Sequence, residues 1–354
     1  MSAAGTDSSG FAPALLAWYD RHGRKSLPWQ SPRTPYRVWL SEIMLQQTQV
    51  ATVIGYFQRF VDALPDLRAL AEAPVDQVLG LWSGLGYYSR ARNLHKAARV
   101  CVERHGGELP QDFDALAALP GIGRSTAGAI LAQAWGLRHA ILDGNVKRVL
   151  SRYHGVEGWP GSTATARTLW QHAEDNTPHV RIADYTQAIM DLGATLCVRS
   201  RPRCGVCPAA SNCVALRDKL TAQLPARKPA KASPTRTTCM LILRDRNDRV
   251  LLQRRPATGV WAELWSLPEA ATPAEAAKVA HATGTQFDAI APLASFVHVF
   301  SHYRLDITPL LARAKPLPQV ADRDDLRWCG ATEFLQLGLP APVRRLLQSL
   351  PETD

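Results

Sequence analysis

The sequence lacks any run of about eighteen consecutive apolar residues, the length that predicts a membrane-spanning helix. Its first ten residues are mostly small and polar, so no signal peptide is predicted either. Of the seven cysteines, Cys101, Cys239 and Cys329 stand alone in apolar surroundings. Isolated cysteines argue against a disulfide framework and predict buried thiols in a reducing compartment. We therefore expect a cytoplasmic protein with no membrane partner.

Acidic residues are fewer than basic residues. Lys and Arg number 41 against 31 Asp and Glu, which gives a formal net charge of +10. Such a balance is often only a solubility feature, but it also suits a polyanionic partner such as nucleic acid. No acidic residue occurs from Lys219 to Arg244, a stretch in which prolines recur. Residues 218–237 are therefore predicted to form an extended basic linker.

The length of 354 residues predicts two or three compact units. From Phe11 to about Arg217, apolar residues follow helical spacing and are interrupted by Pro and Gly, which predicts many short helices. Beyond the linker, residues 238–354 predict a separate α+β domain, so the fold class is multidomain, α and α+β. Its expected elements are a hairpin from 239–243 and 250–252, strands at 296–300 and 303–307, and helices at 274–282 and 343–350.

The segment LPGIGRSTAG, residues 119–128, places Gly121 and Gly123 in a tight turn between two helices. Glycine there lets a DNA backbone approach closely, and free N–H groups at the start of the next helix can bind a phosphate. Ser125 or Thr126 is expected to cap that helix. A plain connection between helices is the alternative for so short a motif.

Asp143, in LDGNVKRVL, precedes a helical run and is predicted to be its N-cap. That structural role would be sufficient on its own. An N-cap carboxylate is also held ionised by the helix dipole and by N–H donors, which suits a group facing a developing oxocarbenium ion. The two interpretations are compatible.

Glu42 lies within the apolar run VWLSEIML, a neighbourhood that should raise its pKa. A carboxylic acid that is still protonated near neutral pH can act as a general acid. Together with an ionised Asp143, it provides the two carboxyl groups that N-glycoside hydrolysis needs. Without Asp143, a surface glutamate beside a buried stripe would be the preferred interpretation.

The polar run QQT, residues 46–48, interrupts the apolar periodicity, and Thr48 is expected to cap the helix that follows. Such a polar tip usually only connects two helices. In an enzyme that flips a base it would fill the gap left in the stack, and Gln47 is the candidate. Leu85 and Tyr87, in SGLGYYSRA, would wedge and stack from the other side, although isolated residues of these types more often belong to a core.

Four cysteines, Cys197, Cys204, Cys207 and Cys213, are spaced C-x6-C-x2-C-x5-C. Four thiolates suit either zinc or a 4Fe-4S cluster, and their spacing predicts a metal centre with a structural role. Zinc sites more often show two close pairs, whereas this string contains one CxxC. The arginines between the cysteines would make the loop a basic surface facing phosphate.

Together these motifs resemble the bacterial MutY-type adenine DNA glycosylases, most strongly between Leu27 and Cys213. The resemblance implies an all-helical helix-hairpin-helix core, with a six-helix barrel over 27–140 and a cluster subdomain formed by 1–26 and 141–217. It favours the 4Fe-4S cluster for the cysteine string. It also implies a monovalent cation at the helix-hairpin-helix.

By the same resemblance, Glu42 protonates adenine at N7 and later assists water, Asp143 stabilises or briefly traps the sugar, and Asn145 orients the Asp143 carboxylate. Gln187 would lie near the flipped adenine, although a helical glutamine could equally be a surface residue. Ser125 stands where related glycosylase/lyases have a lysine, whose amine cleaves the strand through a Schiff base. Some adenine glycosylases have a tyrosine there. A serine predicts a monofunctional glycosylase.

Residues 238–354 resemble a Nudix fold without its metal-binding box. Where that acidic box should fall, the chain reads AEAAKVAHATG, whose single acidic residue cannot form a magnesium site. Nucleotide hydrolysis is therefore not expected. The segment VFSHYRL, residues 299–305, resembles the adenine glycosylases, in which Ser301 and His302 would sense 8-oxoguanine.

We therefore expect a monomeric base excision repair enzyme, associated with the bacterial nucleoid through double-stranded DNA. It would flip out adenine paired with 8-oxoguanine or guanine and hydrolyse its bond to deoxyribose. A lyase for oxidised pyrimidines agrees less well with Ser125. A non-catalytic iron-sulfur DNA-binding module would not need Glu42, Asp143 and Gln47 together. A nucleotide-pool Nudix hydrolase would need the missing acidic box.

Overall fold

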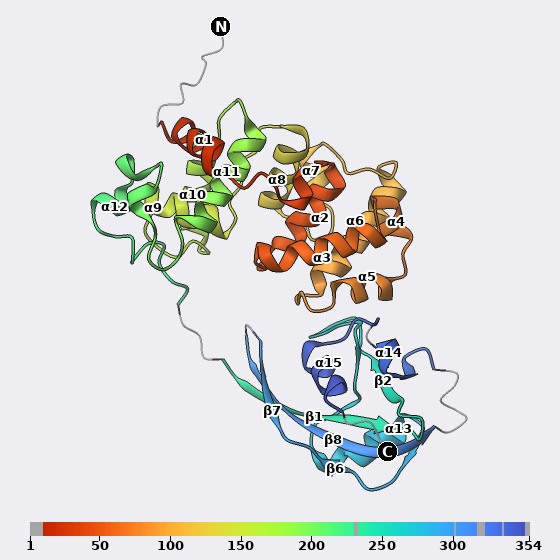
Figure 1. Cartoon of the computed structure of the whole chain (residues 1–354). Helices are drawn as coiled ribbons and strands as arrows, with labels where there is room; N and C mark the ends of the chain where they lie inside the picture. The colour runs from red at the N-terminus through yellow and green to blue at the C-terminus, as the bar shows by residue number, and fades with distance from the viewer. Residues whose placement is uncertain (1–9, 230–232, 301, 317–322, 335, 351–354) are drawn as a thin grey trace. The chain divides into compact units, whose positions relative to one another are not determined.

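The computed structural model describes residues 10–229, 233–300, 302–316, 323–334 and 336–350. The chain divides into two compact units. One is formed by Met1–Glu72 and Asn93–Pro229, and the other by Ala73–Arg92 and Ala230–Asp354. The first unit is helical and the second is built around a mixed β-sheet (Figure 1). These folds confirm the predicted combination of an α region with an α+β domain.

The helical unit is assembled from short helices, as the Pro and Gly breaks predicted. Helix α6 (Ser89–Arg104) begins in the second unit and continues into this one. The other helices of the unit are α1 (Phe11–His22), α2 (Pro35–Leu45), α3 (Val50–Ala63), α4 (Leu67–Glu72), α7 (Phe113–Ala117), α8 (Arg124–Trp135), α9 (Gly144–Tyr153), α10 (Thr163–Asn176), α11 (Ile182–Thr195) and α12 (Val214–Arg217).

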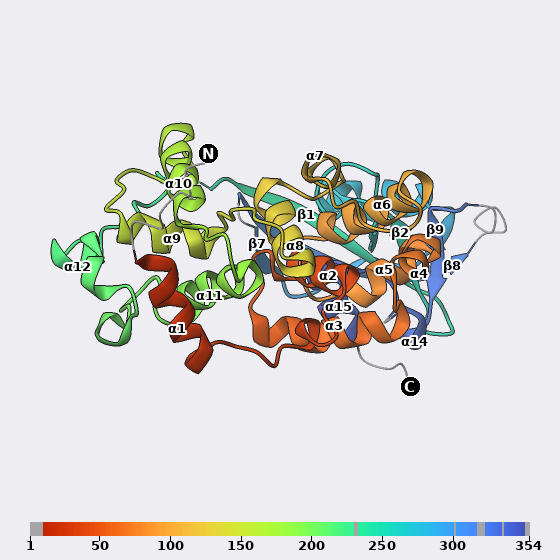
Figure 2. The ribbon, with the colours of Figure 1, turned by 90° about the horizontal axis from the view of Figure 1, so that it is seen from above.

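Two groups of helices make up this unit. Figure 2 shows α1, α9, α10, α11 and α12 at one end and α2, α3, α4, α7 and α8 at the other. Helix α8 packs against both α2 and α11 and so joins the two groups. The first group encloses a core that includes Phe11, Leu15, Tyr153 and Leu192. The junction between the groups therefore lies around α2, α8 and α11.

Local sequence sets the ends of the helices at this junction. The Thr34 hydroxyl caps α2 by accepting the Arg37 N–H at 3.3 Å, and Pro35 occupies the first turn, where it needs no hydrogen-bond partner. Gly136 ends α8 in the left-handed conformation at φ 70°, which favours glycine. The ends of α2 and α8 are thus specified by short-range chemistry.

The second unit contains a sheet with the strand order β3-β2-β1-β8-β5. Its long strands β1 (Thr235–Arg244) and β8 (Arg304–Pro316) pair in parallel, whereas β1 and β2 (Val250–Arg254) form the predicted antiparallel hairpin. The remaining strands are β3 (Trp265–Ser266), β4 (Glu269–Ala270), β5 (Thr285–Phe287), β6 (Ala291–Pro292), β7 (Phe296–Val299) and β9 (Leu326–Cys329).

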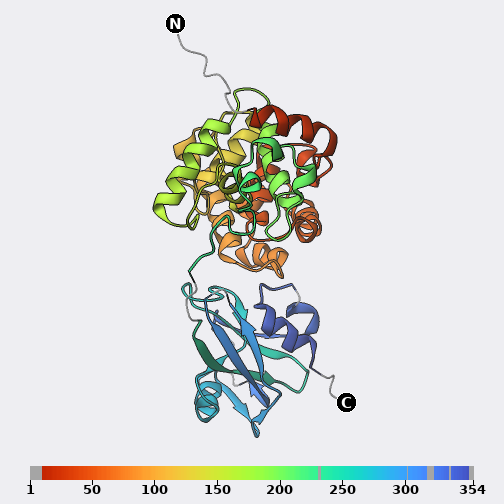
Figure 3. The ribbon, with the colours of Figure 1, turned by 90° about the vertical axis from the view of Figure 1, so that its left-hand side faces the viewer.

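Both faces of this sheet are buried. Alternate residues of β1 enter different cores, with Met240 and Ile242 on one side and Leu241 and Leu243 on the other. Helices α14 (Ala331–Phe334) and α15 (Ala341–Gln348) contribute to the first core, and α13 (Ala276–Ala282) contributes to the second, so helices lie on both sides of the strands (Figure 3). The helices and strands predicted for this domain are therefore confirmed.

One segment was not assigned to this unit by the sequence. Residues 73–92, with helix α5 (Val75–Trp82), belong to the same compact unit as the C-terminal sheet. Strand β1 begins at Thr235, inside the span expected to be linker. Cys101, Cys239 and Cys329 are all buried, as predicted. No helix within the described ranges is long and apolar enough to span a membrane.

Candidate active site and cysteine pocket

Glu42 projects from α2 into the junction of the helical unit. Gln133, on α8, donates its side-chain N–H to Glu42 Oε1 at 2.8 Å. The pKa of Glu42 is raised to about 7, chiefly by burial and then by the nearby negative charge of Asp143, while the hydrogen bond from Gln133 lowers it. The raised pKa agrees with the prediction from its apolar neighbours. Near neutral pH, a large share of Glu42 carries a proton that it can donate.

Asp143 is the N-cap of α9, as predicted. Its Oδ1 accepts the Val146 N–H at 2.7 Å. The N–H donors of Val146 and Asn145 lower its pKa, as expected for an N-cap, but burial raises it by more than these donors and the nearby cations lower it, so the net shift is upward. Asp143 still has donors that Glu42 lacks, and its charge acts on Glu42. The two carboxyl groups therefore lie in unlike surroundings, with backbone N–H donors at Asp143 and a single side-chain donor at Glu42.

The glycine turn before α8 has the predicted geometry but a different cap. Gly121 adopts φ +80°, and a Cβ there would come within 2.8 Å of Asn93 Cβ. Gly123 is the N-cap of α8 without a side-chain hydrogen bond, so neither Ser125 nor Thr126 caps this helix. Both glycines are exposed, which leaves their backbone accessible.

Ser125 serves the segment before Asp143 instead. Its Oγ accepts the Leu142 N–H at 2.8 Å. The hydroxyl therefore ties the start of α8 to the residue that immediately precedes the Asp143 carboxylate. Thr126 is engaged with the loop after α2, because Gln46 Nε2 donates to its Oγ1 at 3.4 Å. Both hydroxyls thus connect α8 to segments that carry predicted site residues.

The tip after α2 is exposed and conformationally unusual. Gln47 is exposed and has φ 58°, a left-handed conformation that is uncommon for residues other than glycine. Thr48 does not cap α3, contrary to the prediction. Gln49 is the N-cap, and the Thr48 hydroxyl donates to the Gln46 carbonyl at 3.4 Å. The tip is therefore tied back on itself, with the Gln47 side chain directed outward.

The Asn145 side chain is held by Arg148. Arg148 Nη2 donates to Asn145 Oδ1 at 2.7 Å, and the Asn145 backbone N–H is the part that acts on Asp143. Arg148 also donates to the Gly193 carbonyl at 2.7 Å and to the Cys197 carbonyl at 2.6 Å. A Cβ on Gly193 would lie 2.6 Å from Asn145 Cβ, so only glycine lets α11 approach α9 this closely.

Gln187 is 4% exposed, so the alternative that it is a surface residue is excluded. Its Nε2 donates to Asp191 Oδ1 at 2.8 Å. Asp191 also accepts both the backbone N–H and the guanidinium of Arg24, the latter at 2.6 Å. These bonds fix the Gln187 amide on the inner face of α11.

Four other predicted residues fall in the second unit. Leu85 is 6% exposed and belongs to a core here, whereas Tyr87 is half exposed, has φ 49° and lies under the Arg90 guanidinium. His302 is exposed beside the Tyr303 ring at 4.8 Å between centroids. Ser301 lies outside the described residues.

All four predicted cysteines, Cys197, Cys204, Cys207 and Cys213, line one pocket at the end of the helical unit, between α9, α11 and the loop that follows α11. Arg152, which sequence reasoning missed, donates to Cys197 Sγ at 3.4 Å and to the Val198 carbonyl at 2.8 Å. In the described part of the chain, no three His, Cys, Asp or Glu side chains are grouped closely enough for one metal ion. The four thiols that line this single pocket could serve as sulfur ligands of a metal centre larger than one ion.

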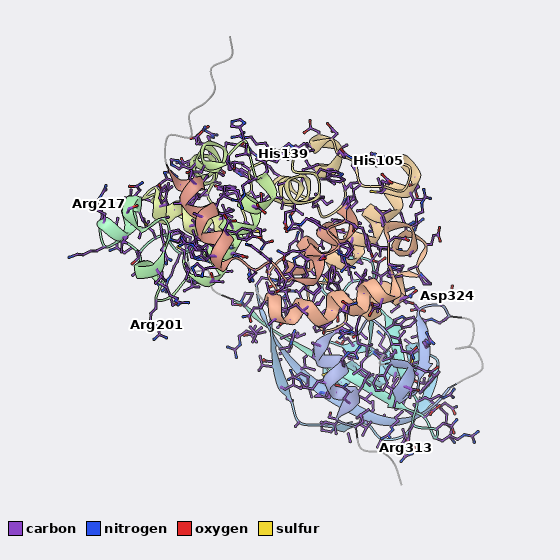
Figure 4. All side chains as sticks on the ribbon, turned by 45° about the horizontal axis from the view of Figure 1, so that its top comes forward. His105, His139, Arg201, Arg217, Arg313 and Asp324 are labelled. Atoms are coloured by element: carbon purple, nitrogen blue, oxygen red, sulfur yellow. The ribbon has the colours of Figure 1, made fainter. Side chains whose placement is uncertain are left out.

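The surface around this pocket is basic. Arg199, Arg201 and Arg203 are exposed between the cysteines, as predicted, and the Arg201 and Arg217 side chains extend outward from this end of the unit (Figure 4). Exposed arginines of this kind suit contact with phosphate.

Besides Arg152, three partners of the predicted residues were missed: Gln133 and Asp191, which are buried, and Arg148, which is partly buried. Gln133 had a visible signal, because it is a polar residue inside the apolar run AILAQAW on α8. Arg148 and Asp191 look like ordinary charged helical residues in the sequence. Their roles depend on contacts with residues distant along the chain.

Both parts of the chain match known protein families. Residues 40–175 match the HhH-GPD superfamily of base excision DNA repair proteins, and residues 239–349 match the NUDIX domain family. The adenine DNA glycosylase of Buchnera aphidicola subsp. Acyrthosiphon pisum is 36% identical over 340 residues, covering 96% of this chain and 97% of the relative. The human adenine DNA glycosylase is 42% identical over 240 residues, covering 65% of this chain and 44% of the human protein.

Among solved structures, a thermostable thymine-DNA glycosylase is similar with a TM-score of 0.55 and 27% identity, covering 60% of this chain and 97% of that chain. The fold and the matches define a DNA glycosylase of base excision repair, with a helix-hairpin-helix core and a C-terminal Nudix domain. More narrowly, the chain belongs to the adenine DNA glycosylase family, because the Buchnera relative matches it over nearly the full length of both proteins.

Proposed function

We propose that this enzyme flips adenine out of duplex DNA, where it is paired with 8-oxoguanine or guanine, and hydrolyses its N-glycosidic bond as a monomer. The observation that carries the proposal is the pair of unlike carboxyl groups, Glu42 with a pKa of about 7 and Asp143 at a helix N-cap. Membership of the adenine DNA glycosylase family supports adenine as the leaving base.

Glu42 is the general acid of the proposed reaction. It protonates adenine at N7, which makes the base a better leaving group, and its carboxylate then assists the attacking water. Gln133 fixes Glu42 Oε1 through its 2.8 Å hydrogen bond. Asp143 faces the sugar as positive charge develops there, and it stabilises or briefly traps that carbon. The backbone N–H groups of Val146 and Asn145 orient the Asp143 carboxylate.

The proposed reaction stops at the abasic site. Strand cleavage through a Schiff base requires an amine, and residue 125 is a serine whose Oγ accepts the Leu142 N–H. Ser125 thus positions the segment that carries Asp143 and supplies no nucleophilic nitrogen. This argument favours a monofunctional glycosylase over a lyase for oxidised pyrimidines.

The DNA contacts proposed for the helical unit follow from exposure. Gly121 and Gly123 present accessible backbone to a phosphate, and their turn would hold a monovalent cation through carbonyl oxygens. The exposed Gln47 and its neighbour Thr48 enter the gap left by the flipped base. In the other unit, Tyr87 stacks on the opened duplex, and Leu85 supports it from a buried position. Gln187 faces the flipped adenine.

We assign a 4Fe-4S cluster to Cys197, Cys204, Cys207 and Cys213. The donor set fits this cluster, because four thiols line one pocket. The Arg152 guanidinium also donates to the Cys197 sulfur, and its positive charge would stabilise a thiolate ligand there. When bound, the cluster would cross-link the loop after α11 and hold its arginines toward phosphate. Replacing Cys207 with Ser should lower the iron content of the purified protein and its duplex affinity together.

The C-terminal domain is proposed to read the base opposite adenine. Its segment 299–305 carries Ser301 and His302, which would distinguish 8-oxoguanine from guanine, and His302 is exposed. The domain has no acidic cluster on α13, so it would bind a base rather than hydrolyse a nucleotide. We further propose that the catalytic region comprises residues 1–217, with the barrel at 27–140 and the cluster subdomain at 1–26 and 141–217, and that 218–237 links it to residues 238–354.

The deciding experiment measures single-turnover base release from duplexes with adenine opposite 8-oxoguanine, adenine opposite guanine, and an oxidised pyrimidine. Release of adenine without strand cleavage supports the proposal. Preferential release of the oxidised pyrimidine with strand cleavage would identify a lyase. Binding without release of any base would leave a non-catalytic DNA-binding protein.

A further inference from the structure

Residues 73–92 are continuous in sequence with the helical region but belong to the compact unit of the C-terminal sheet. This segment consists of α5, the turn after it and the first residues of α6. It includes Tyr87, which is proposed to stack on the opened duplex, and Leu85, which is proposed to support Tyr87 from a buried position. The contacts that hold the segment therefore bear on where these residues lie.

An ion pair holds α5. Arg254, on β2, donates to Asp76 Oδ1 at 2.6 Å, and both side chains are about one-third exposed. The Trp265 indole N–H lies 3.5 Å from the other carboxylate oxygen. Asp76 is in the first turn of its helix, where a negative charge is favoured by the helix dipole. The first turn of α5 is thus attached to the sheet.

The turn after α5 is held at both ends. The Tyr88 hydroxyl donates to the Leu339 carbonyl at 2.7 Å in a buried contact, and Arg344 Nη2 donates to Ser83 Oγ at 2.8 Å. Tyr88 OH and Ser83 Oγ also lie 3.2 Å apart. Leu85 and Tyr87 lie between these two attachment points along the chain.

A third contact holds the start of α6. Arg92 Nη1 donates to the Ala262 carbonyl at 2.6 Å, and its Nε lies 3.3 Å from Glu263 Oε2. Ala262 is flanked by Trp261 at φ 58° and Glu263 at φ 60°, both in the left-handed region. The left-handed conformation costs free energy for any residue larger than glycine. Two such residues so close in sequence therefore require surrounding contacts that hold the loop.

Helix α5 also packs closely, backbone against backbone, on the segment before α15. A Cβ on Gly80 would lie 2.2 Å from the Gln336 carbonyl oxygen, and a Cβ on Gly338 would lie 2.6 Å from Leu79 Cβ. Glycine at both positions allows α5 and the segment before α15 to meet at backbone distance. A fit of this kind favours one relative position of the two elements.

The loop that receives Arg92 also reaches the proposed recognition turn. The Trp261 ring lies 5.1 Å from the Phe300 ring and 5.6 Å from the His298 ring, measured between centroids. Phe300 in turn lies 6.1 Å from the His302 ring. Arg92 is therefore connected to His302 within one unit, through the backbone of the loop at 261–263 and then through the rings of Trp261 and Phe300.

We propose that residues 73–92 are a docking element through which the C-terminal domain sets the position of Leu85 and Tyr87 at the DNA. The proposal rests on the proposed function, since it needs a C-terminal domain that reads the base opposite adenine. Correct seating of 8-oxoguanine at 299–305 would favour the docked position, and docking would place Tyr87 for stacking. The docked segment thereby acts as a positioning element for lesion preference, with no part in bond cleavage.

The test reverses the charges of the ion pair in the full-length enzyme. Asp76→Arg and Arg254→Asp are compared with each other, with the double variant and with wild type. The readouts are the ratio of single-turnover adenine release opposite 8-oxoguanine to that opposite guanine, and hydrogen exchange of the backbone amides at 83–92. Each single reversal should lower the ratio about two- to five-fold, as expected for a partly exposed ion pair, and should speed exchange. The double variant should restore both.

Two further variants keep the test decisive. Tyr88→Phe removes one hydroxyl and leaves the buried Leu339 carbonyl unpaired, so it should lower the ratio about five-fold or more without reversing any charge. Arg323→Asp breaks an ion pair of the same unit, 2.7 Å from Asp325, that includes no residue of 73–92, and it should change neither readout. This control separates docking from a general loss of charge balance.

The outcomes distinguish the two levels of the proposal. If wild type discriminates between the duplexes and every variant keeps that ratio, docking does not transmit recognition and the inference is overturned, while the proposed function stands. Faster exchange with an unchanged ratio also overturns the inference, since docking would then be structural only. If wild type itself shows no preference, the C-terminal domain does not read the opposite base, and both ideas fail.

Discussion

Replacing Glu42 with Gln tests the central step of the proposed reaction. The amide keeps the size of the side chain and can still bond to Gln133, but it cannot donate a catalytic proton. Because Glu42 has a pKa of about 7, the wild-type enzyme holds a usable acid near neutral pH. General acid catalysis contributes about 10²- to 10⁴-fold, so adenine release should fall by at least ~100-fold. Single-turnover release from an adenine–8-oxoguanine duplex measures the loss, and duplex affinity should change little.

The same residue predicts a pH profile with a defined sign. Because catalysis uses its acid form and Glu42 titrates at about 7, the rate should fall about tenfold per pH unit well above pH 7. In the unfolded chain Glu42 titrates near 4.5, so between these values only the folded state holds the proton. The Glu42 contribution to stability is therefore lost as pH rises from 4.5 to 7.

Glu42→Gln should remove that pH-dependent loss, and its melting temperature relative to wild type should rise across this window. Thermal melts of both proteins at several pH values measure the difference. Activity of the Gln variant within a few-fold of wild type would refute the assignment of Glu42 as the acid. A melting difference independent of pH would refute the raised pKa as its physical basis.

The remaining predictions concern other parts of the molecule. Ser125→Lys should acquire strand cleavage, with a borohydride-trapped DNA adduct, and a strong adduct with wild type would contradict the monofunctional reaction. Gly193→Ala should destabilise the enzyme by about 1–3 kcal/mol in denaturant unfolding, because the new Cβ would lie 2.6 Å from Asn145 Cβ; an unchanged midpoint would refute the close approach. The double variant Ser301→Ala, His302→Ala should lose about tenfold or more of the preference for 8-oxoguanine over guanine, measured by single-turnover release. A preserved ratio would show that these residues do not sense the lesion.

Local patterns were sufficient to single out the two carboxyl groups of the candidate site. The N-cap position of Asp143 depends on the residues that follow it, and the raised pKa of Glu42 follows from its apolar neighbours on α2. The helices of the first unit and the main strands of the second were predicted for the same reason. Periodicity and helix-end chemistry act over only a few positions.

What the sequence could not supply depends on distant contacts. The net upward shift of the Asp143 pKa was not predicted, because burial, which only tertiary packing sets, outweighs the N-cap donors. Gln133 and Arg148 take part in the site through hydrogen bonds to Glu42 and Cys197, which lie about fifty or more positions away in the sequence. Ser125 was a candidate helix cap, yet its hydroxyl accepts from Leu142 in another segment. Thr48 was missed for a local reason, because its hydroxyl donates to the Gln46 carbonyl two positions back.

The membership of residues 73–92 in the C-terminal unit has a consequence for biosynthesis. These residues leave the ribosome well before Ala230, where the rest of their unit begins. At about 5–20 residues per second, the delay is on the order of ten seconds. During that interval the surface around Leu79 and Gly80 has no partner, since Gly338 and Gln336 are not yet made. Helix α5 can therefore complete its packing only after the C-terminal residues of its unit have been synthesised.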